Sequence, residues 1–370
     1  MRLKPAIIRG WDVPKEDYTT AHQRDGLVKL LIELSNVCNL SCAGCFTKRV
    51  DGGWNGKTKK RLSNELPYEH QVELLGEAAR LGVKTVDIVG AGEPTLDPRF
   101  NEIIDRINDF GMYAVVFTHG VSKEFEHMDA WKKRDVSFFV KLWSRNHALQ
   151  DQYVSGSLPD YSKRRDETIE RMLDAGLVQG NEVVVDGINY RTTRIGADVL
   201  VMNSNVGEVE DILRYCRERN IMPIIKTYIP EGPTRFAQSE NLRIYREDQL
   251  AELKRDEVSP ADFAELRRRL VRLDQDEFGI PEMRTLYPQA VKCTQSMASM
   301  YVTITGDIKS CVGTHLSYGK YEAGKGMLAK AIRERTEKVG FGCVPRLEDA
   351  KIRGLPIAQN LKDIYSEGMR

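Results

Sequence analysis

The chain has 370 residues, of which 41% are hydrophobic, so it is too long for one small domain and can bury a large core. Its 55 lysines and arginines nearly balance 54 aspartates and glutamates, which excludes the strongly basic character typical of nucleic-acid-binding proteins. No stretch approaches the roughly 20 apolar residues of a membrane span, and residues 1–11 lack the apolar core of a signal peptide. Seven cysteines without such a signal indicate a reducing compartment. We therefore expect a cytoplasmic protein with neither a nucleic-acid nor a membrane partner.

Short apolar runs typical of strands alternate with helical patterns through about the first 230 residues. The expected strands cover residues 28–35, 83–89, 113–117, 136–142, 197–202 and 222–227. Apolar residues at helical spacing follow several of them, as at 68–82 and 209–216. Six such units imply parallel strands joined by right-handed crossovers. The pattern predicts an α/β fold whose polar motifs, at the carboxyl ends of strands, lie where ligands bind.

The sequence Glu231-Gly-Pro233 marks the end of this alternation. We expect three regions: a partial barrel over residues 1–235, a helical linker over 236–280, and a small C-terminal domain with a tail over 281–370. Ser259 followed by Pro260 predicts the start of a linker helix. This helix carries an apolar stripe, which we expect to pack against the barrel, made by Phe263, Leu266, Leu270 and Leu273.

Three cysteines follow the first expected strand within eight residues: Cys38, Cys42 and Cys45. The spacing Cys-x3-Cys-x2-Cys places three thiolates on one short loop, whereas a four-iron cluster normally has four cysteine ligands. Such a site would hold three irons and leave the fourth iron open to another ligand. A zinc site would need four ligands, usually as separated pairs, and a redox disulfide would need only two of the thiols. These two alternatives stay open, and the spacing favours the cluster.

With Phe46 directly after the third cysteine, the run resembles the signature of the radical S-adenosylmethionine (SAM) superfamily. The resemblance implies a partial (β/α)6 barrel and a [4Fe–4S] cluster on Cys38, Cys42 and Cys45, whose free iron binds the amino and carboxylate groups of SAM. It also implies that the reduced cluster donates an electron to SAM, and that the resulting 5′-deoxyadenosyl radical removes a hydrogen atom from an unactivated C–H bond. An electron donor such as flavodoxin or ferredoxin is then an expected partner.

The sequence Ala91-Gly92-Glu93-Pro94, after the second expected strand, resembles the Gly-Gly-Glu-Pro motif of the same superfamily. The resemblance implies that Gly92 and Glu93 receive the amino group of SAM, and Ala91 is a departure from the motif. Ser144 follows the fourth expected strand, Arg194 and Asn203 flank the fifth, and the resemblance implies that these polar residues also bind SAM. Each could equally be an ordinary loop residue. His119, where relatives often carry Asn, is more often a hydrogen-bonded structural residue in such a position.

A second cysteine pattern lies near the C-terminus, where Cys293-x12-Gly306-x4-Cys311 encloses a predicted hairpin over 300–305 and 307–310. The pattern resembles the opening of the SPASM/twitch domain, which carries auxiliary iron–sulfur clusters in many radical SAM enzymes. Because Cys343 is the single later cysteine, the shorter twitch form is the better match. The resemblance implies an auxiliary [4Fe–4S] cluster on Cys293, Cys311 and Cys343. Unrelated thiols or a zinc knuckle are the alternatives.

The fourth iron of this auxiliary cluster would be open to substrate or held by a residue other than cysteine, with His315 and Asp349 as the nearest candidates. Cys216 is not expected to be a ligand, because it lies on the apolar face of its predicted helix, where cysteine is usually a small core residue. The basic segment over 47–61 is either a solvated loop or a lid that attracts an anionic substrate.

No catalytic side chain is assigned from the sequence. We expect a small-molecule substrate, namely a sugar, aminocyclitol or nucleotide-like metabolite that undergoes oxidation or rearrangement. The alternative is maturation of a ribosomal peptide. Such maturases commonly carry a recognition domain before the barrel, whereas 37 residues precede Cys38. A non-enzymatic electron carrier is a third hypothesis, but a carrier has no need of SAM-type motifs.

Overall fold

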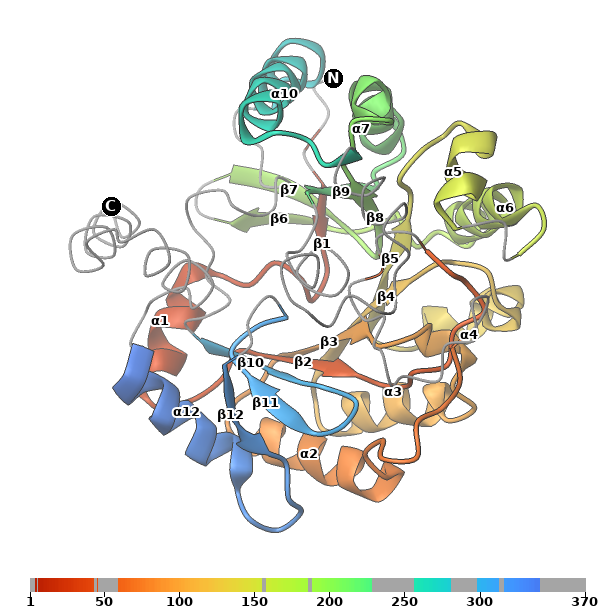
Figure 1. Ribbon diagram of the computed structural model, residues 1–370. Helices are drawn as coiled ribbons and strands as arrows, with labels where there is room; N and C mark the ends of the chain where they lie inside the picture. The colour runs from red at the N-terminus through yellow and green to blue at the C-terminus, as the bar shows by residue number, and fades with distance from the viewer. Residues whose placement is uncertain are drawn as a thin grey trace.

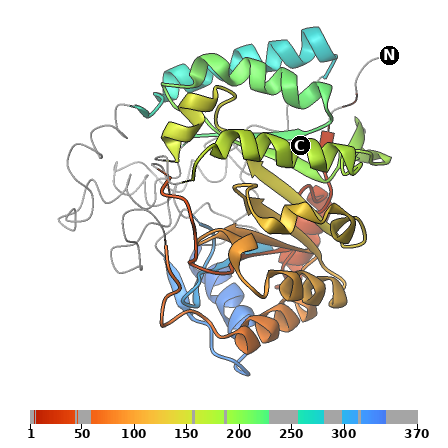
Figure 2. The same cartoon turned by 90° about the vertical axis from the view of Figure 1, so that its right-hand side faces the viewer.

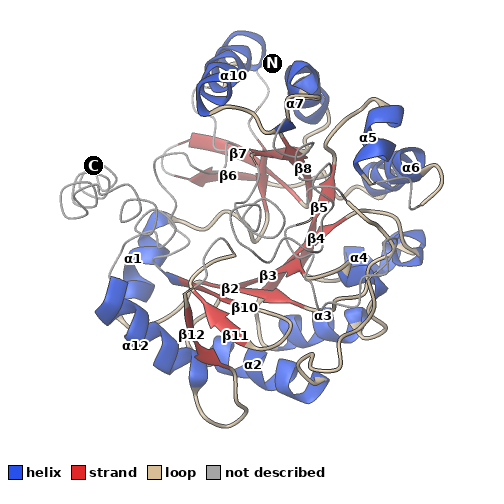
Figure 3. Ribbon diagram, viewed as in Figure 1, coloured by secondary structure: helices blue, strands red, loops and turns tan. Residues whose placement is uncertain are grey.

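The computed structural model describes residues 4, 6–42, 45, 59–154, 158–185, 188–227, 256–280, 298–312 and 316–339. Their architecture is α/β, with helices packed around a curved nine-stranded sheet (Figures 1 and 3). The strand order is β12-β11-β10-β2-β3-β4-β5-β8-β9. None of the described helices has the length and apolar character that crossing a membrane requires.

All six expected strands are present, and they lie side by side in chain order with parallel pairing. They are β2 (Lys29–Glu33), β3 (Thr85–Gly90), β4 (Tyr113–Thr118), β5 (Val136–Lys141), β8 (Ile195–Leu200) and β9 (Met222–Lys226). Parallel strands are usually covered by helices on at least one face, and their alternating side chains separate into two sets. One set points toward the helices, and the other lines the inside of the curved sheet.

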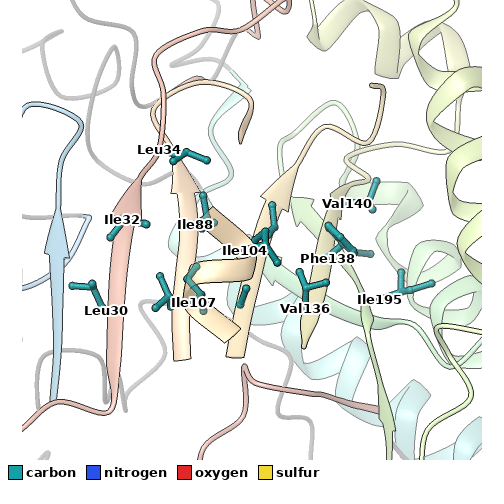
Figure 4. Close-up of a cluster of buried hydrophobic side chains, with 14 of the residues drawn as sticks. Leu30, Ile32, Leu34, Ile88, Ile104, Ile107, Val136, Phe138, Val140 and Ile195 are labelled. Atoms are coloured by element: carbon teal, nitrogen blue, oxygen red, sulfur yellow. The ribbon is translucent and has the colours of Figure 1, made fainter. Parts of the chain in front are cut away.

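The main core lies between the sheet and the helices. Figure 4 shows residues such as Leu30, Ile88 and Phe138 beside Ile104 and Ile107 of α3. The helices are α1 (Lys15–Gln23), α2 (Tyr68–Arg80), α3 (Phe100–Asp109), α4 (Met128–Lys132), α5 (His147–Tyr153), α6 (Tyr161–Asp174), α7 (Val209–Glu218), α10 (Pro260–Leu273) and α12 (Met327–Val339). The two helices expected over 68–82 and 209–216 correspond to α2 and α7.

Ser259 is the N-cap of helix α10, and its hydroxyl accepts a hydrogen bond from the Asp262 backbone N–H at 3.1 Å. Leu266, Leu270 and Leu273 of its apolar stripe are buried in the main core. Figure 2 shows α10 running beside α7, with which it is in contact. The predicted packing of this helix against the barrel is therefore confirmed.

The expected hairpin near the C-terminus is present as β10 (Ser299–Val302) and β11 (Asp307–Lys309), and β12 (Ser317–Lys320) pairs antiparallel to β11. Gly306 lies in the turn of the hairpin with φ +84°, a backbone conformation that residues with a Cβ rarely adopt. Strand β10 also pairs in parallel with β2, so a seventh parallel strand joins the sheet. The C-terminal region therefore shares one sheet with the barrel strands.

The structure also contains a second sheet of three strands, which was not predicted from the sequence. It has the order β1-β7-β6 and consists of β1 (Ala6–Ile8), β6 (Glu182–Val185) and β7 (Ile188–Thr193). After β1, residues 9–11 cross the amino-terminal parts of the parallel strands, and we call this segment the N-terminal floor. The Arg9 and Gly10 carbonyls accept hydrogen bonds from Ser137 and Thr85, both at 2.8 Å. Trp11 packs edge-on against Phe117 and Phe139.

Candidate functional site

The cysteine loop follows β2 at the carboxyl end of the parallel strands. Cys42 is buried in a small apolar cluster with Leu40 and Trp143, and Cys38 and Cys45 pack against this cluster. Burial raises the pKa of the Cys38 thiol to about 12, with smaller contributions from the neighbouring Cys42 and Glu93. A thiol in this environment needs a strong positive charge, such as that of a bound metal, to become a thiolate.

Lys59 connects the cysteine loop to the next strand end. Its backbone pairs with that of Cys38 through two hydrogen bonds of 3.1 and 2.8 Å. Its buried ammonium donates to the Ala91 carbonyl at 2.5 Å. Arg61 is also engaged, because it pairs with Glu65 at 2.9 Å and with Asp97 at 2.5 Å. Lys59 and Arg61 of the predicted basic lid are therefore bound to other parts of the protein, while residues 47–58 of that segment lie outside the described residues.

The segment that contains Gly92 and Glu93 lies directly against the cysteine loop. The Gly92 N–H donates to the Ser35 carbonyl at 2.7 Å, and the Glu93 N–H donates to the Val37 carbonyl at 2.8 Å. A Cβ at Gly92 would lie 2.1 Å from the Val37 carbonyl oxygen, so any other residue would push the two segments apart. The backbone of residues 35–37, just before Cys38, is therefore in direct contact with the backbone of Gly92 and Glu93.

The buried Glu93 carboxylate joins the ends of β3 and β4. Its Oε1 accepts hydrogen bonds from the Thr118 and Thr95 hydroxyls at 2.6 and 2.7 Å, and its Oε2 accepts one from the His119 N–H at 2.7 Å. A carboxylate oxygen can accept two hydrogen bonds. The Oε2 atom therefore has capacity for one further donor, as the predicted contact with an amino group requires.

His119 links the end of β4 to the cysteine loop. The Val121 N–H donates to its Nδ1 at 2.9 Å, and its Nε2 lies 2.8 Å from the Asn39 side-chain oxygen. This pattern corresponds to the neutral imidazole with the proton on Nε2. Burial lowers the pKa of His119, although the nearby Glu93 opposes this shift. His119 is thus the hydrogen-bonded structural residue that we considered more usual for such a position.

Lys141, the last residue of β5, contacts a cysteine of the loop. Its Nζ lies 2.9 Å from Cys42 Sγ and 4.5 Å from the centre of the Trp143 ring. Burial tends to lower the pKa of Lys141, but the charge of Cys42 and the hydrogen bond to it raise this pKa above its usual range. Sequence reasoning missed this contact, and its only signal was a lysine at the end of a buried strand.

The remaining predicted SAM-binding residues are placed differently. The Ser144 hydroxyl donates to the Glu208 carboxylate at 2.8 Å, and exposed Asn203 is hydrogen bonded to the backbone of Asp256 and Glu257. Both residues follow the carboxyl ends of their strands. Arg194 precedes β8, and its guanidinium donates to backbone carbonyls at the start of β5 and in the preceding segment. The structure therefore puts Arg194 at the opposite end of the sheet from the cysteine loop.

The second group of cysteines is described only in part. Phe46, Cys293, Cys343, His315 and Asp349 lie outside the described residues. Cys311 is partly exposed and follows β11, which runs antiparallel to β10, so the chain at this point heads toward the amino ends of the parallel strands. Cys216 is fully buried in the main core, as predicted, and burial raises the pKa of its thiol to about 12.

Comparison with protein families identifies the chain. The model of the radical SAM superfamily matches residues 32–235, which is more than half of the sequence. The chain belongs to the radical SAM superfamily. This confirms the identification made from the cysteine loop, and it agrees with the α/β architecture and its parallel strands. As a radical SAM protein, the chain is an enzyme that uses SAM and iron–sulfur chemistry.

Curated relatives match only short segments. A SAM-dependent nucleotide dehydratase from Flammeovirga pacifica is 34% identical over 90 residues, which cover 24% of this chain and 29% of that protein. A PqqA peptide cyclase from Methylorubrum extorquens (strain PA1) is 36% identical over 103 residues, which cover 28% of this chain and 24% of the cyclase. The matched segments therefore span less than a third of either relative.

Solved structures show the same fold over most of the chain. SuiB from Streptococcus suis, bound to its precursor peptide SuiA, has a TM-score of 0.59 at 14% identity, covering 89% of this chain and 70% of SuiB. The enzyme anSMEcpe with bound AdoMet has a TM-score of 0.54 at 13% identity, covering 85% of this chain and 84% of that one. At such low identity the likeness shows a shared fold.

The described residues fit the [4Fe–4S] cluster that the superfamily implies. Three thiols gather on one loop, a lysine ammonium faces one of them, and a carboxylate oxygen with spare capacity lies near Cys38. In the described part of the chain, no three His, Cys, Asp or Glu side chains are arranged to hold a single metal ion. Ligands of a cluster bind different irons, so a single-ion arrangement is not expected of these cysteines.

Proposed function

We propose that this radical SAM enzyme cleaves SAM reductively at a [4Fe–4S] cluster held by Cys38, Cys42 and Cys45, and that it oxidises or rearranges a small polar metabolite. When bound, the cluster and SAM supply a 5′-deoxyadenosyl radical that abstracts a hydrogen atom. The observation that carries this proposal is the backbone fit between the cysteine loop and the Gly92–Glu93 segment at the carboxyl end of the sheet.

The protein residues then have the task of holding and orienting SAM. Glu93 Oε2 is the proposed acceptor for the SAM amino group, because its other oxygen is already engaged by Thr95 and Thr118. Lys59 keeps the Ala91 carbonyl and the cysteine loop at a fixed separation. Preorganised groups of this kind need no rearrangement during the reaction, which is how enzymes obtain most of their electrostatic stabilisation.

Charged residues on the inner face of the sheet favour the proposal of a polar substrate. Near the carboxyl ends of β8 and β9, Asp198 and Lys226 form an ion pair of 2.5 Å, with side-chain exposures of 13% and 20%. Asp198 is also the register partner of Lys141 on β5, so the two residues project from the same face. Charged side chains are rarely removed from water unless they are paired, as these two are. Polar groups of a substrate are suited to this part of the inner face.

An auxiliary [4Fe–4S] cluster on Cys293, Cys311 and Cys343 belongs to the same proposal. It would accept the electron of the substrate radical in an oxidation, or anchor the substrate in a rearrangement. The support is the predicted hairpin between Cys293 and Cys311, which is present as β10 and β11. Because β10 pairs with β2, the hairpin is joined directly to the strand that leads into the first cysteine loop.

Modification of a peptide is the second candidate function. It is favoured by the 103-residue match to a PqqA peptide cyclase and by the fold shared with SuiB, which was solved with its precursor peptide. The match to a nucleotide dehydratase favours the small-molecule substrate to a similar degree. The two candidates share the SAM-cleaving site and differ in what occupies the inner face of the sheet.

The test is anaerobic turnover with a chemical reductant and SAM. The wild type should release 5′-deoxyadenosine and methionine slowly without substrate, and alanine at Cys38, Cys42 and Cys45 together should abolish the release. Cys216→Ala is the matched control, because Cys216 is a core thiol. Unchanged release by the triple variant would refute the proposal. Among sugars, aminocyclitols, nucleotides and peptides, the class that accelerates release identifies the substrate.

A further inference from the structure

Lys141 is distinctive among the charged residues on the inner face of the sheet. Lys29 lies 3.5 Å from the Asp87 carboxylate, and Lys226 lies 2.5 Å from Asp198. For Lys141, no carboxylate lies within ion-pair distance in the part of the chain that the structure describes, and its Nζ donates instead to Cys42 Sγ at 2.9 Å. The sulfur that Lys141 contacts belongs to a cysteine that the proposed function makes an iron ligand, and a ligating cysteine is a thiolate.

The surroundings of Lys141 keep this contact out of bulk water. The ammonium lies over the Trp143 ring, with 4.5 Å between Nζ and the ring centre, and Trp143 belongs to the same apolar cluster as Cys42. A charge in such a site interacts with its neighbours much more strongly than a charge at the surface. Leaving it without an anionic partner would be costly.

We propose that Lys141 is a positioning residue for the first cluster, which holds the Cys42 thiolate by a charge-assisted hydrogen bond and raises the reduction potential of the cluster. The proposal rests on the proposed function, because it requires a cluster on Cys38, Cys42 and Cys45. Reduction adds one negative charge to the cluster, and a fixed positive charge beside a sulfur ligand stabilises the reduced form more than the oxidised form. Hydrogen bonds to the ligand sulfurs and local charge are known determinants of such potentials.

A different role for Lys141 would be to bind the SAM carboxylate, since a lysine ammonium is also suited to that group. The two roles make separable predictions. A tuning residue changes the potential of the cluster in the absence of SAM. A SAM ligand changes the affinity for SAM and leaves that potential unchanged.

The experiment is a redox titration of the SAM-free cluster, followed by electron paramagnetic resonance. Cys293, Cys311 and Cys343 are replaced by alanine in every sample of the full chain, so that one cluster is observed. In this background, Lys141→Met removes charge and donor, and Lys141→Gln removes the charge but retains a donor. Lys132→Met is the matched control, because Lys132 is 47% exposed on α4 and pairs with Asp129.

We expect the reduction potential to be highest in the parent with Lys141, lower in Lys141→Gln and lowest in Lys141→Met. Lys132→Met should leave this potential unchanged. Equal potentials in all variants, with about four irons bound, would overturn the proposal, and so would weaker SAM binding at an unchanged potential. If both Lys141 variants fail to bind iron while their circular dichroism spectra are unchanged, the holding role is supported. A parent protein that binds no cluster would contradict the proposed function instead.

Discussion

The two ends of the parallel sheet are built in different ways. At the amino end, the N-terminal floor closes the inside of the sheet with Trp11, and a buried ion pair between Lys29 and Asp87 lies beside it. The Lys29 ammonium also donates to the Trp11 carbonyl at 2.5 Å. Trp11 and Lys29 contact each other, and Asp87 faces the Lys29 charge at 3.5 Å. All three side chains are buried, so we expect this end to matter for stability and not for ligand binding.

At the carboxyl end, polar groups converge from several strands. Glu93 joins the ends of β3 and β4, Lys141 reaches a cysteine from β5, and Lys59 holds two loops together. Here the contacts leave capacity for a ligand, as at Glu93 Oε2. We therefore expect changes at the amino end to affect stability, and changes at the carboxyl end to affect SAM chemistry. Substitutions of Trp11 and Asp87 test the amino end, and substitution of Lys59 tests the carboxyl end.

The largest expected effect concerns the auxiliary cysteines. If Cys293, Cys311 and Cys343 hold a second cluster, the wild type should contain about eight irons, and alanine at all three positions should leave about four. The variant should still cleave SAM but form no product, because the substrate radical would lose its electron acceptor or anchor. Iron analysis and product chromatography measure the two effects. Loss of the second cluster in Cys216→Ala, with Cys343→Ala retaining it, would contradict this ligand set.

The second prediction tests the amino end. Trp11→Ala should lower the free energy of unfolding by about 4 kcal/mol, the usual cost of removing a buried tryptophan side chain. Cleavage of SAM per folded molecule should be unchanged, since Trp11 belongs to the N-terminal floor, whose backbone contacts the amino-terminal parts of β3 and β5. Denaturant unfolding and 5′-deoxyadenosine release provide the measurements. Phe110→Ala is the control, because Phe110 is 40% exposed and its removal should lower the free energy of unfolding much less. A folded Trp11→Ala variant unable to cleave SAM would break the division between the two ends.

The third prediction uses the pH dependence of Asp87. Burial raises its pKa from 3.8 to about 6, although Lys29 opposes this shift. A carboxyl group whose pKa is higher in the folded state stabilises the fold below its unfolded pKa, and this contribution is lost as the pH rises through the folded value. At about 1.4 kcal/mol per pKa unit, the loss amounts to roughly 3 kcal/mol. The free energy of unfolding of the wild type, relative to that of Asp87→Asn, should therefore decline between about pH 4 and pH 6. A difference that stays constant over this range would disprove the predicted contribution of Asp87.

The sequence predicted the strands of the barrel because their signal is local. Each of the six combines a short apolar run with turn residues at its end, and each was placed within about two residues of its observed bounds. The second sheet was missed because β6 and β7 are half-exposed and carry polar residues such as Glu182 and Arg191. The pairing of β10 with β2 joins segments about 270 residues apart, and no local pattern encodes it.

The parts of the site that were predicted also have local sequence signals, and the parts that were missed depend on long-range contacts. The cysteine spacing and the position of Gly92 are local motifs, and both segments lie together as the superfamily motifs require. The contacts of His119 with Asn39 and of Lys141 with Cys42 join residues 80 and 99 positions apart. Arg194 was wrongly grouped with strand ends that bind ligands, because it precedes its strand and therefore lies at the amino end of the sheet.

The smallest expected effect, and the most selective one, concerns Lys59 at the carboxyl end. Lys59→Met removes the hydrogen bond from its ammonium to the Ala91 carbonyl, so the segment carrying Gly92 and Glu93 should be held less firmly against the cysteine loop. We expect SAM to bind about tenfold more weakly, in the range found for outer contacts of metal sites, with the iron content unchanged.

The matched control is Lys60→Met, because the neighbouring Lys60 side chain is exposed, and its backbone carbonyl, which accepts a hydrogen bond from Asn36, is kept in the variant. Equilibrium binding of SAM to the reconstituted protein measures both variants. If the basic segment acted mainly by attracting anions, the two substitutions would weaken SAM binding equally and the effect would fade with salt. If Lys59 acts as a clamp, only Lys59→Met weakens binding and the loss persists at high salt, because its ammonium is buried.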